Sequence, residues 1–266
     1  MCYYDIVTKC IRKTSLIIIL LIFSRKDLHC QVGLFYWYKM RWEMKLIQGD
    51  CLEELKNIAD KSVDLVVIDP PYQIVAGGSG GCFGADKRTY HAEVKTLSDG
   101  IANNVLDELA RVMKKINIYI WCNKNQLKQY INYFEDLGCT TDLITWHKTN
   151  PVPTCNNKYL SDTEYILFFR EKGAKIYGSY ETKKKYYVTT TNKEDKKKYN
   201  HPTIKPLNII KNLIINSSNE NEVVLDCFMG SGTTGVACKE LNREFIGIEL
   251  DEKYFNMAKE RIESIK

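Results

Sequence analysis

The chain alternates short apolar runs with longer, helix-like segments. The short runs predict seven strands: Lys45–Gln48, Val63–Ile68, Asn117–Trp121, Asp142–Trp146, Glu164–Phe169, Val223–Asp226 and Phe245–Glu249. The longer segments predict helices over Cys51–Ala59, Ile101–Lys114, Asn125–Leu137, Leu207–Asn216, Thr233–Leu241 and Asp251–Ile265. A continuous apolar strand such as Val63–Ile68 indicates burial on both faces. The pattern therefore predicts an α/β fold, a doubly wound, seven-stranded and mostly parallel sheet.

Two stretches interrupt this alternation. Gln73–Asp99 contains five glycines between Gly77 and Gly84, which predicts a loop. Lys172–Asn200 is polar, basic and rich in tyrosine. We interpret residues 171–200 as a short basic insertion in a domain that covers residues 44–266.

The first 43 residues differ from the rest of the chain. They contain an eight-residue apolar run, Leu16–Phe23, with basic residues on both sides. This run is too short to span a bilayer, which takes about 20 apolar residues, and no small-residue cleavage site follows it. Met44 opens directly into the first predicted strand. We therefore predict that residues 1–43 are a leader outside the functional domain, with a natural start at Met44 or Met40.

The bulk composition narrows the class of protein only moderately. The 266 residues suffice for one substantial domain, 44% are hydrophobic, and the formal net charge is +5. The ten cysteines include no Cys-x-x-Cys pair, and the four histidines do not flank them at zinc-ligand spacing. We expect no metal site and no disulfide framework, but reduced thiols in a cytoplasmic protein.

A glycine-rich turn follows the predicted strand Val223–Asp226. Its segment Gly230–Gly235 satisfies the pattern G-x-G-x-x-G, and Glu249 ends the next strand nineteen residues after Gly230. Glycines let the backbone approach a nucleoside-type cofactor, and helix-start amides can receive a carboxylate. An acidic side chain at the end of the second strand can accept both ribose hydroxyls. The fingerprint alone does not separate NAD from S-adenosylmethionine.

The tetrapeptide Asp69-Pro70-Pro71-Tyr72 closes the strand Val63–Ile68, at the edge where open α/β sheets place ligands. An exocyclic amino group is a poor nucleophile, because its lone pair is delocalised into the ring. A carboxylate and a backbone carbonyl that accept its two hydrogens would favour tetrahedral nitrogen. Proline offers only a carbonyl, and Tyr72 offers a face on which an extruded base can stack. The two motifs together indicate methyl transfer to a nucleobase nitrogen.

With these motifs the chain resembles the S-adenosylmethionine-dependent DNA amino-methyltransferases, in the permuted (beta) group whose catalytic motif precedes the cofactor motif. The resemblance covers most of Met44–Lys266. It rests on Asp69–Tyr72, Trp146–Pro153, Glu164–Leu167, His201–Pro206, Asp226–Thr233 and Phe245–Glu249. Cys227 stands where the family often has proline. The resemblance implies a Rossmann-like class I methyltransferase fold, and the aspartate in the catalytic motif is typical of adenine N6 methylation.

The resemblance also implies roles for individual residues. The methionine end of the cofactor would be lined by Asp226, Phe228, Gly230, Gly232 and Thr233. Glu249 would hold the ribose. Asp50 would approach the adenine ring of the cofactor, or act only as a helix N-cap, since Asp50 and Glu53 are spaced like a capping box. Lys205 would meet the cofactor carboxylate, or remain a solvated lysine.

The basic insertion falls where this group places its target-recognition region. Arg170–Lys205 carries eleven Lys/Arg and four Asp/Glu, with five tyrosines among them. Lysines neutralise phosphates, and tyrosines stack on bases or donate hydrogen bonds. The predicted DNA contacts are Lys183, Lys184, Lys185, Tyr186 and Tyr187, joined by Lys87 and Arg88 of the glycine-rich loop. The alternative is a solvated charged loop.

We therefore predict a site-specific DNA adenine-N6 methyltransferase that uses S-adenosylmethionine and binds double-stranded DNA. Cytosine N4 methylation by the same site remains an alternative. Alternatives of other classes are an NAD-dependent oxidoreductase and an inactive DNA-binding protein. We expect no membrane partner. A homodimer and a partner restriction endonuclease both remain open at this point.

Overall fold

A computed structural model of the chain describes residues 44–73, 100–151, 153, 159–191, 199 and 204–265. The chain divides into two units, Met1–Arg41 and Trp42–Lys266, and all described residues belong to the second. The strands of this unit are β1 (Met44–Gln48), β2 (Leu65–Ile68), β3 (Asn117–Cys122), β4 (Thr140–Lys148), β5 (Thr163–Arg170), β6 (Tyr186–Thr189), β7 (Val223–Asp226) and β8 (Glu244–Glu249). The helices are α4 (Cys51–Leu55), α6 (Asn103–Val112), α7 (Leu127–Asp136), α9 (Leu207–Ser217), α10 (Thr233–Glu240) and α11 (Glu252–Glu263).

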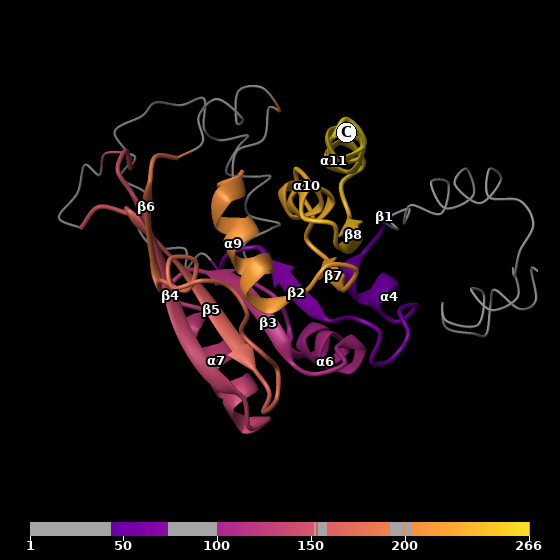
Figure 1. Cartoon of the computed structure of the whole chain (residues 1–266), viewed down its shortest axis with the longest axis horizontal. Coiled ribbons are helices and arrows are strands. Elements are labelled where there is room, and N and C mark those ends of the chain that lie inside the picture. The colour runs from indigo at the N-terminus through magenta and orange to yellow at the C-terminus, as the bar shows by residue number, and fades with distance from the viewer. Residues whose placement is uncertain are drawn as a thin grey trace, which may run out of the picture. The chain divides into compact units, whose positions relative to one another are not determined.

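Within the described residues, eight strands form one sheet in the order β1-β8-β7-β2-β3-β5-β4-β6 (Figure 1). The strands from β1 to β3 in this order are all parallel. β5 runs antiparallel to both of its neighbours, β3 and β4, and β6 runs parallel to β4. The predicted α/β fold with a mostly parallel sheet is confirmed, with one strand more than the seven that the sequence pattern predicts.

The additional strand, β6, lies inside the predicted basic insertion. It pairs with β4 in the register Thr145↔Tyr186, and its side chains alternate between exposed and half-buried positions. The inward-facing Tyr187 packs against the hydrophobic core, whereas Tyr186 is exposed. Part of the predicted insertion therefore extends the sheet at its edge.

Helices cover both faces of the sheet, and each face has its own hydrophobic core (Figure 1). All four residues of β2 are buried. Successive side chains of a strand point to opposite faces, so Val66 and Ile68 join the core that contains α4, α6 and α7. Leu65 and Val67 join the core formed with α9, α10 and α11. In the described part of the chain, no helix is both long and apolar enough to cross a membrane.

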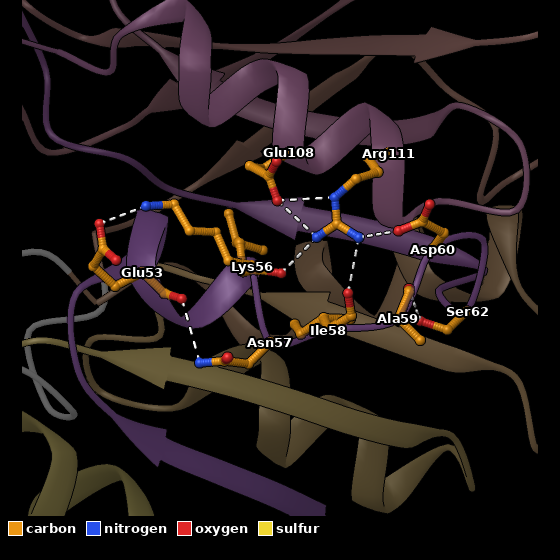
Figure 2. Close-up of polar contacts among 10 residues, drawn as sticks. Glu53, Lys56, Asn57, Ile58, Ala59, Asp60, Ser62, Glu108 and Arg111 are labelled. Carbon is orange, nitrogen blue, oxygen red and sulfur yellow. Dashed lines mark hydrogen bonds and ion pairs between the residues drawn. The ribbon is translucent and has the colours of Figure 1, made fainter.

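One arginine ties α6 to the chain that follows α4. Arg111 donates to the carbonyl oxygens of Leu55 at 2.8 Å and Ile58 at 2.9 Å, and it forms ion pairs with Glu108 and Asp60 (Figure 2). Carbonyls at the end of a helix have no partner inside the helix. The Leu55 carbonyl also accepts from the Ile58 amide at 3.0 Å, so the guanidinium adds a second hydrogen bond at the end of α4. The helix ends at Leu55, earlier than the pattern predicts.

The centre of the sheet contains a topological switch point. β2 and β7 lie side by side and parallel. From β7 the chain continues through α10 to β8 on one side, and from β2 it continues through α6 to β3 on the other. Loops that leave toward opposite sides open a crevice at the carboxyl ends of such strands, where open α/β sheets bind their ligands.

Candidate active site

A pocket of about 470 Å³ opens at the carboxyl ends of β1, β2, β7 and β8. This volume is in the range of small-molecule sites. Its lining includes the four residues of the predicted catalytic motif, Asp69, Pro70, Pro71 and Tyr72. It also includes Asp50, Lys205, Asp226, Phe228, Gly230, Thr233 and Glu249. Segments some 150 residues apart in the sequence thus meet in one cavity.

Asp226 is buried at the end of β7 and accepts two hydrogen bonds. Its Oδ1 accepts from the Phe228 amide at 3.0 Å, and its Oδ2 accepts from the Thr234 hydroxyl at 2.6 Å. Burial raises the pKa of Asp226 to about 7, although both hydrogen bonds act in the opposite direction. Among the described residues, the charged groups that act on Asp226 are the carboxylates Asp69 and Glu249, and none is a cation. Its ionised form is therefore open to a cationic ligand.

Glu249 ends β8 and supports the glycine turn. Its Oε2 accepts from the Gly230 amide at 2.7 Å, and its Oε1 accepts from the Asp251 amide at 2.9 Å. Gly230 has a φ of 50°, a conformation that glycine adopts without steric cost. A carboxylate offers about four acceptor positions, so Glu249 can still receive two ribose hydroxyls. Burial raises the pKa of this carboxyl as well.

Gly232 differs from the other predicted cofactor residues, because it is not among those that line the pocket. It has a φ of 75° and precedes the first residue of α10. A Cβ at this position would lie 2.9 Å from the Cβ of Ala258 in α11. The structure therefore supplies a packing reason for this glycine, and its contact with the cofactor stays a prediction.

Asp50 caps α4 and also lines the pocket. Its Oδ1 accepts from the amides of Leu52 at 2.9 Å and Glu53 at 3.2 Å, which is an N-cap. The Glu53 side chain does not complete a capping box; it pairs with Lys56 at 2.7 Å. The prediction that Asp50 is a helix N-cap is confirmed. Its place in the pocket lining is compatible with the other prediction, a contact with the adenine ring of the cofactor.

The carboxylate of Asp69 belongs to a chain of four charged side chains. Asp69 Oδ2 lies 2.6 Å from Lys205 Nζ, which also lies 3.3 Å from Glu164 Oε2. The other oxygen of Glu164 pairs with Lys148 Nζ at 2.6 Å. The Tyr72 hydroxyl donates to Glu164 Oε2 at 3.2 Å. Lys205 also lies over the rings of Tyr72 and Trp121, at 5.2 and 5.0 Å from the ring centroids.

Burial and the lysines oppose each other at the two carboxylates. Burial by itself raises the pKa of Glu164, but Lys205 and Lys148 outweigh it and lower the pKa to about 2. At Asp69 burial dominates and raises the pKa above its ordinary value, although Lys205 acts to lower it. Of these two carboxyls, Asp69 therefore has the higher pKa and is protonated first as the pH falls.

One oxygen of Asp69 remains unpaired. Oδ1 is buried and makes no hydrogen bond with any described residue. Buried polar atoms in folded proteins almost always have a partner, so an exception calls for an explanation. A donor on a bound substrate would supply the missing partner.

The backbone after Asp69 is held by the connection between β3 and α7. The side-chain amide of Gln126 donates to the Pro71 carbonyl at 3.1 Å, and it also donates to the Tyr130 hydroxyl at 2.9 Å. Asn123 donates to the carbonyl of Gln73 at 2.8 Å. These bonds hold the double-proline segment, which lines the pocket.

Glu164 and Lys148 have no role in the sequence-based prediction, although their segments contribute to the family resemblance. The register Trp146↔Glu164 pairs β4 with β5. Since side chains two apart lie on one face, Trp146, Lys148 and Glu164 share a face. This register could have suggested the ion pair once the two strands were known to be neighbours. Lys205 lies in the segment before α9, and its contact with Glu164 depends on where that segment folds. No pattern in the sequence indicates this contact.

The predicted DNA contacts gather around the start of β6. Lys184 pairs with Glu181 and Lys185 pairs with Asp142. Tyr186 is exposed, with 56% of its surface accessible. Tyr187 packs against the core instead, and its contact with DNA stays a prediction. Lys87 and Arg88 lie outside the described residues. In the described ranges, His, Cys, Asp and Glu form no group of three or more that could hold a metal ion.

Comparison with known proteins gives one consistent result. The model of a DNA methylase family, N6_N4_Mtase, matches residues 63–260. The type II methyltransferase M2.LlaDCHI of Lactococcus lactis subsp. cremoris is 34% identical over 82% of this chain and 88% of its own length. M2.DpnII of Streptococcus pneumoniae is 32% identical over 85% and 92%. The crystal structure of an M1.HpyAVI–SAM complex superposes with a TM-score of 0.61, at 28% identity over 82% of this chain and 99% of that one.

The chain belongs to the N6/N4 DNA methylase family. The predictions of a DNA amino-methyltransferase, of its Rossmann-like fold and of S-adenosylmethionine as cofactor are confirmed. The pocket fits this cofactor, since it combines a suitable volume, a glycine turn and two carboxylates with open acceptor positions.

Proposed function

We propose that this chain methylates the N6 amino group of an adenine extruded from double-stranded DNA. The observation that carries the proposal is the buried, unpaired Oδ1 of Asp69 in the pocket. An amino group offers the hydrogen that this oxygen lacks. The neighbouring Pro70 lines the same pocket and contributes a carbonyl. Together they would accept both amino hydrogens and favour a tetrahedral nitrogen with its lone pair exposed.

The residues around Asp69 would position the base and receive its proton. Tyr72, held by Glu164, presents an aromatic face for stacking. When bound, S-adenosylmethionine supplies an electrophilic methyl group, whose bonding electrons remain on sulfur. The amino nitrogen gains the methyl carbon and releases one proton. Asp69 is placed to accept it, since burial raises the pKa of its carboxyl.

The cofactor would lie along the strand ends next to the base. Glu249 would accept the ribose hydroxyls, and Asp226, Phe228, Gly230 and Thr233 would line the methionine end. Asp50 would approach the adenine ring of the cofactor. The absence of a described cationic partner at Asp226 supports this arrangement, because the cofactor carries a sulfonium charge.

DNA would be held mainly by the segment around β6. Lys183, Lys184 and Lys185 would contact phosphates, and Tyr186 would contact bases or sugars, together with Lys87 and Arg88. The class of the relatives, type II methyltransferases, supports action at a defined DNA sequence, beside a restriction endonuclease in the cytoplasm.

Adenine is preferred to cytosine on the basis of the aspartate at position 69. The deciding experiment is methylation of DNA by the purified chain, followed by nucleoside analysis of the product. We expect N6-methyladenine. N4-methylcytosine as the product would move the proposal to the alternative base, and no methylated base would overturn it.

Asp69→Ala tests the role of the carboxylate. Methyl transfer should fall by at least about 100-fold, the scale for loss of one preorganised hydrogen-bonding group at a reacting centre. The matched control is Asp64→Ala, because Asp64 lies at the opposite end of the same strand and also pairs with a lysine, Lys114, at 2.8 Å. The control should keep its methyl-transfer rate in the folded fraction. Equal rates for the two variants would overturn the role of Asp69.

A further inference from the structure

Lys205 occupies an unusual position for a lysine. Its side chain is only 8% exposed, and it lies between the carboxylates of Asp69 and Glu164 and over two aromatic rings. Burial of an ammonium group is costly unless the group is paired. The two carboxylates supply that pairing. The buried ammonium is therefore stable only while it stays in contact with them.

The contact between Lys205 and Asp69 is selective. The ammonium lies 2.6 Å from Oδ2, while Oδ1 has no partner among the described residues. The ion pair therefore distinguishes two oxygens that are otherwise equivalent. It fixes the rotation of the carboxylate and leaves one oxygen for a substrate.

The same lysine is linked to the stacking tyrosine. Glu164 Oε2 accepts from the Tyr72 hydroxyl at 3.2 Å and lies 3.3 Å from Lys205 Nζ. Lys148 holds the other oxygen of Glu164 at 2.6 Å. Both side chains of the catalytic motif that would touch the base are therefore oriented by one buried ion pair.

We propose that Lys205, anchored by Glu164, is a positioning residue that orients the Asp69 carboxylate toward the target amino group and keeps it able to accept hydrogen bonds. This rests on the proposed function of Asp69. It differs from the sequence-based expectation that Lys205 meets the cofactor carboxylate. Lys205 would act on the base through Asp69, and affinity for the cofactor would depend on other residues.

The proposal predicts a change in pH dependence, because several groups act on Asp69. Lys205 favours its ionised form, whereas burial and the negative charge of Glu164 disfavour it. Tyr72, Cys122 on β3 and Asp226 on β7 also interact with this carboxyl. Removal of the ammonium takes away the largest interaction that favours the charged form. The pKa of Asp69 should then rise, and the acid limb of the pH–rate profile should move to higher pH.

The test uses the full chain with Lys205→Met, which keeps the length of the side chain and removes its charge. Single-turnover methyl transfer, measured from pH 5 to 9, should fall at least tenfold at neutral pH. Its acid limb should move upward by at least one pH unit. The dissociation constant of S-adenosylmethionine, measured by calorimetry, should change by less than twofold. The matched control is Lys211→Met, which breaks the ion pair with Glu240 outside the pocket and should leave the profile unchanged.

A second variant distinguishes positioning from simple neutralisation of Glu164. If Lys205 served only to neutralise that buried carboxylate, Lys205→Met with Glu164→Gln would restore the rate. We expect no restoration, because Asp69 still lacks its partner. The double variant removes both charges of the Lys205–Glu164 pair and leaves Asp69 and Lys148 without these partners, so its folded fraction is measured together with its rate.

Three results would overturn the inference. One is a dissociation constant for S-adenosylmethionine that rises tenfold or more with an unmoved acid limb, which would place Lys205 at the cofactor. Another is restored turnover in the double variant, and the third is a Lys205→Met variant that behaves like the unmodified chain. Asp69→Ala is measured in parallel: if it is inactive while Lys205→Met behaves like the unmodified chain, the inference alone fails. If Asp69→Ala is fully active, the proposed function fails.

Discussion

Two pairs of carboxylates meet at the strand ends, and they are stabilised in different ways. Asp226 and Glu249 accept hydrogen bonds from backbone amides and a hydroxyl, without a described cation nearby. Asp69 and Glu164 are paired with Lys205 and Lys148. The first pair keeps negative charge for a cationic ligand, whereas the second is electrically balanced and presents one oriented acceptor. Under the proposed function, the first pair attracts the cofactor and the second positions the base.

The largest expected effect is on stability, at the lysine-paired carboxylates. Glu164→Ala removes the shared partner of two largely buried lysines, and loss of one member of a buried pair costs about 3–5 kcal/mol. We expect the free energy of unfolding, measured with urea, to fall by that amount. Glu181→Ala is the control, because its pair with Lys184 is exposed and such pairs contribute about 0–1 kcal/mol. Similar losses in both variants would contradict the buried network.

The next effect is on cofactor binding, at the amide-paired carboxylates. Glu249→Ala should weaken S-adenosylmethionine binding by about 1–3 kcal/mol, the scale for polar groups left without partners. Calorimetry measures this change, and NAD should not bind. Glu252→Ala, at the exposed start of α11, serves as the control. Tighter binding of NAD than of S-adenosylmethionine would remove the assignment of this pair to the methyl donor.

A smaller effect concerns the pH dependence of cofactor affinity. Burial raises the pKa of Asp226 to about 7, so the ionised fraction should rise from about one tenth at pH 6 to about nine tenths at pH 8. If the charged form binds the cationic cofactor, affinity should be about tenfold higher at pH 8 than at pH 6. Asp226→Asn should lose this increase and retain only the titration of the ligand itself. Identical slopes for both proteins would show that Asp226 does not supply the attraction.

The sign for stability is opposite to that for binding. The folded-state pKa of Asp226 lies above its ordinary value, so the folded state binds more protons than the unfolded state between these two values. Stability of the free chain should therefore decrease as pH rises from about 4 to 7. Asp226→Asn should reduce this decrease.

The smallest expected effect concerns the salt dependence of DNA binding by the basic segment before β6. Replacement of Lys183, Lys184 and Lys185 by glutamine should reduce the slope of log affinity against log salt by roughly 0.9 for each phosphate that is no longer neutralised. Lys184 and Lys185 already have acidic partners, so their contributions should be lower than that of Lys183. DNA affinity across a salt titration measures the slope, and cofactor affinity should not change. An unchanged slope would show that recognition depends on other residues.

The sequence predicted those parts of the molecule that depend on local pattern. Apolar runs located the seven other strands. The signal was strongest for β2 and β3, which are buried along their whole length, because burial on both faces demands continuous apolar residues. The short strand β6 was missed, since its tyrosines and threonine follow three lysines and resemble a solvated loop. Its inward side chain Tyr187 finds a core only because β4 lies beside it.

The candidate site divides in the same way. The catalytic tetrapeptide and the glycine turn were recognisable because each needs specific residue types at fixed spacing in one segment. The roles of Gln126, Lys148 and Glu164 were not, because each acts on a segment far from it in the sequence. Lys205 shows the limit most clearly: its residue type suggested an anion partner, but sequence did not reveal which one.

By itself, the sequence determined the α/β pattern, the order of the catalytic and cofactor motifs, and the chemistry that those motifs can perform. The tertiary structure decided which groups surround each carboxylate. Amides and a hydroxyl surround Asp226 and Glu249, and lysines surround Asp69 and Glu164. The physical reason is that electrostatic interactions depend on distance and burial, which are properties of the packed sheet and not of any single segment.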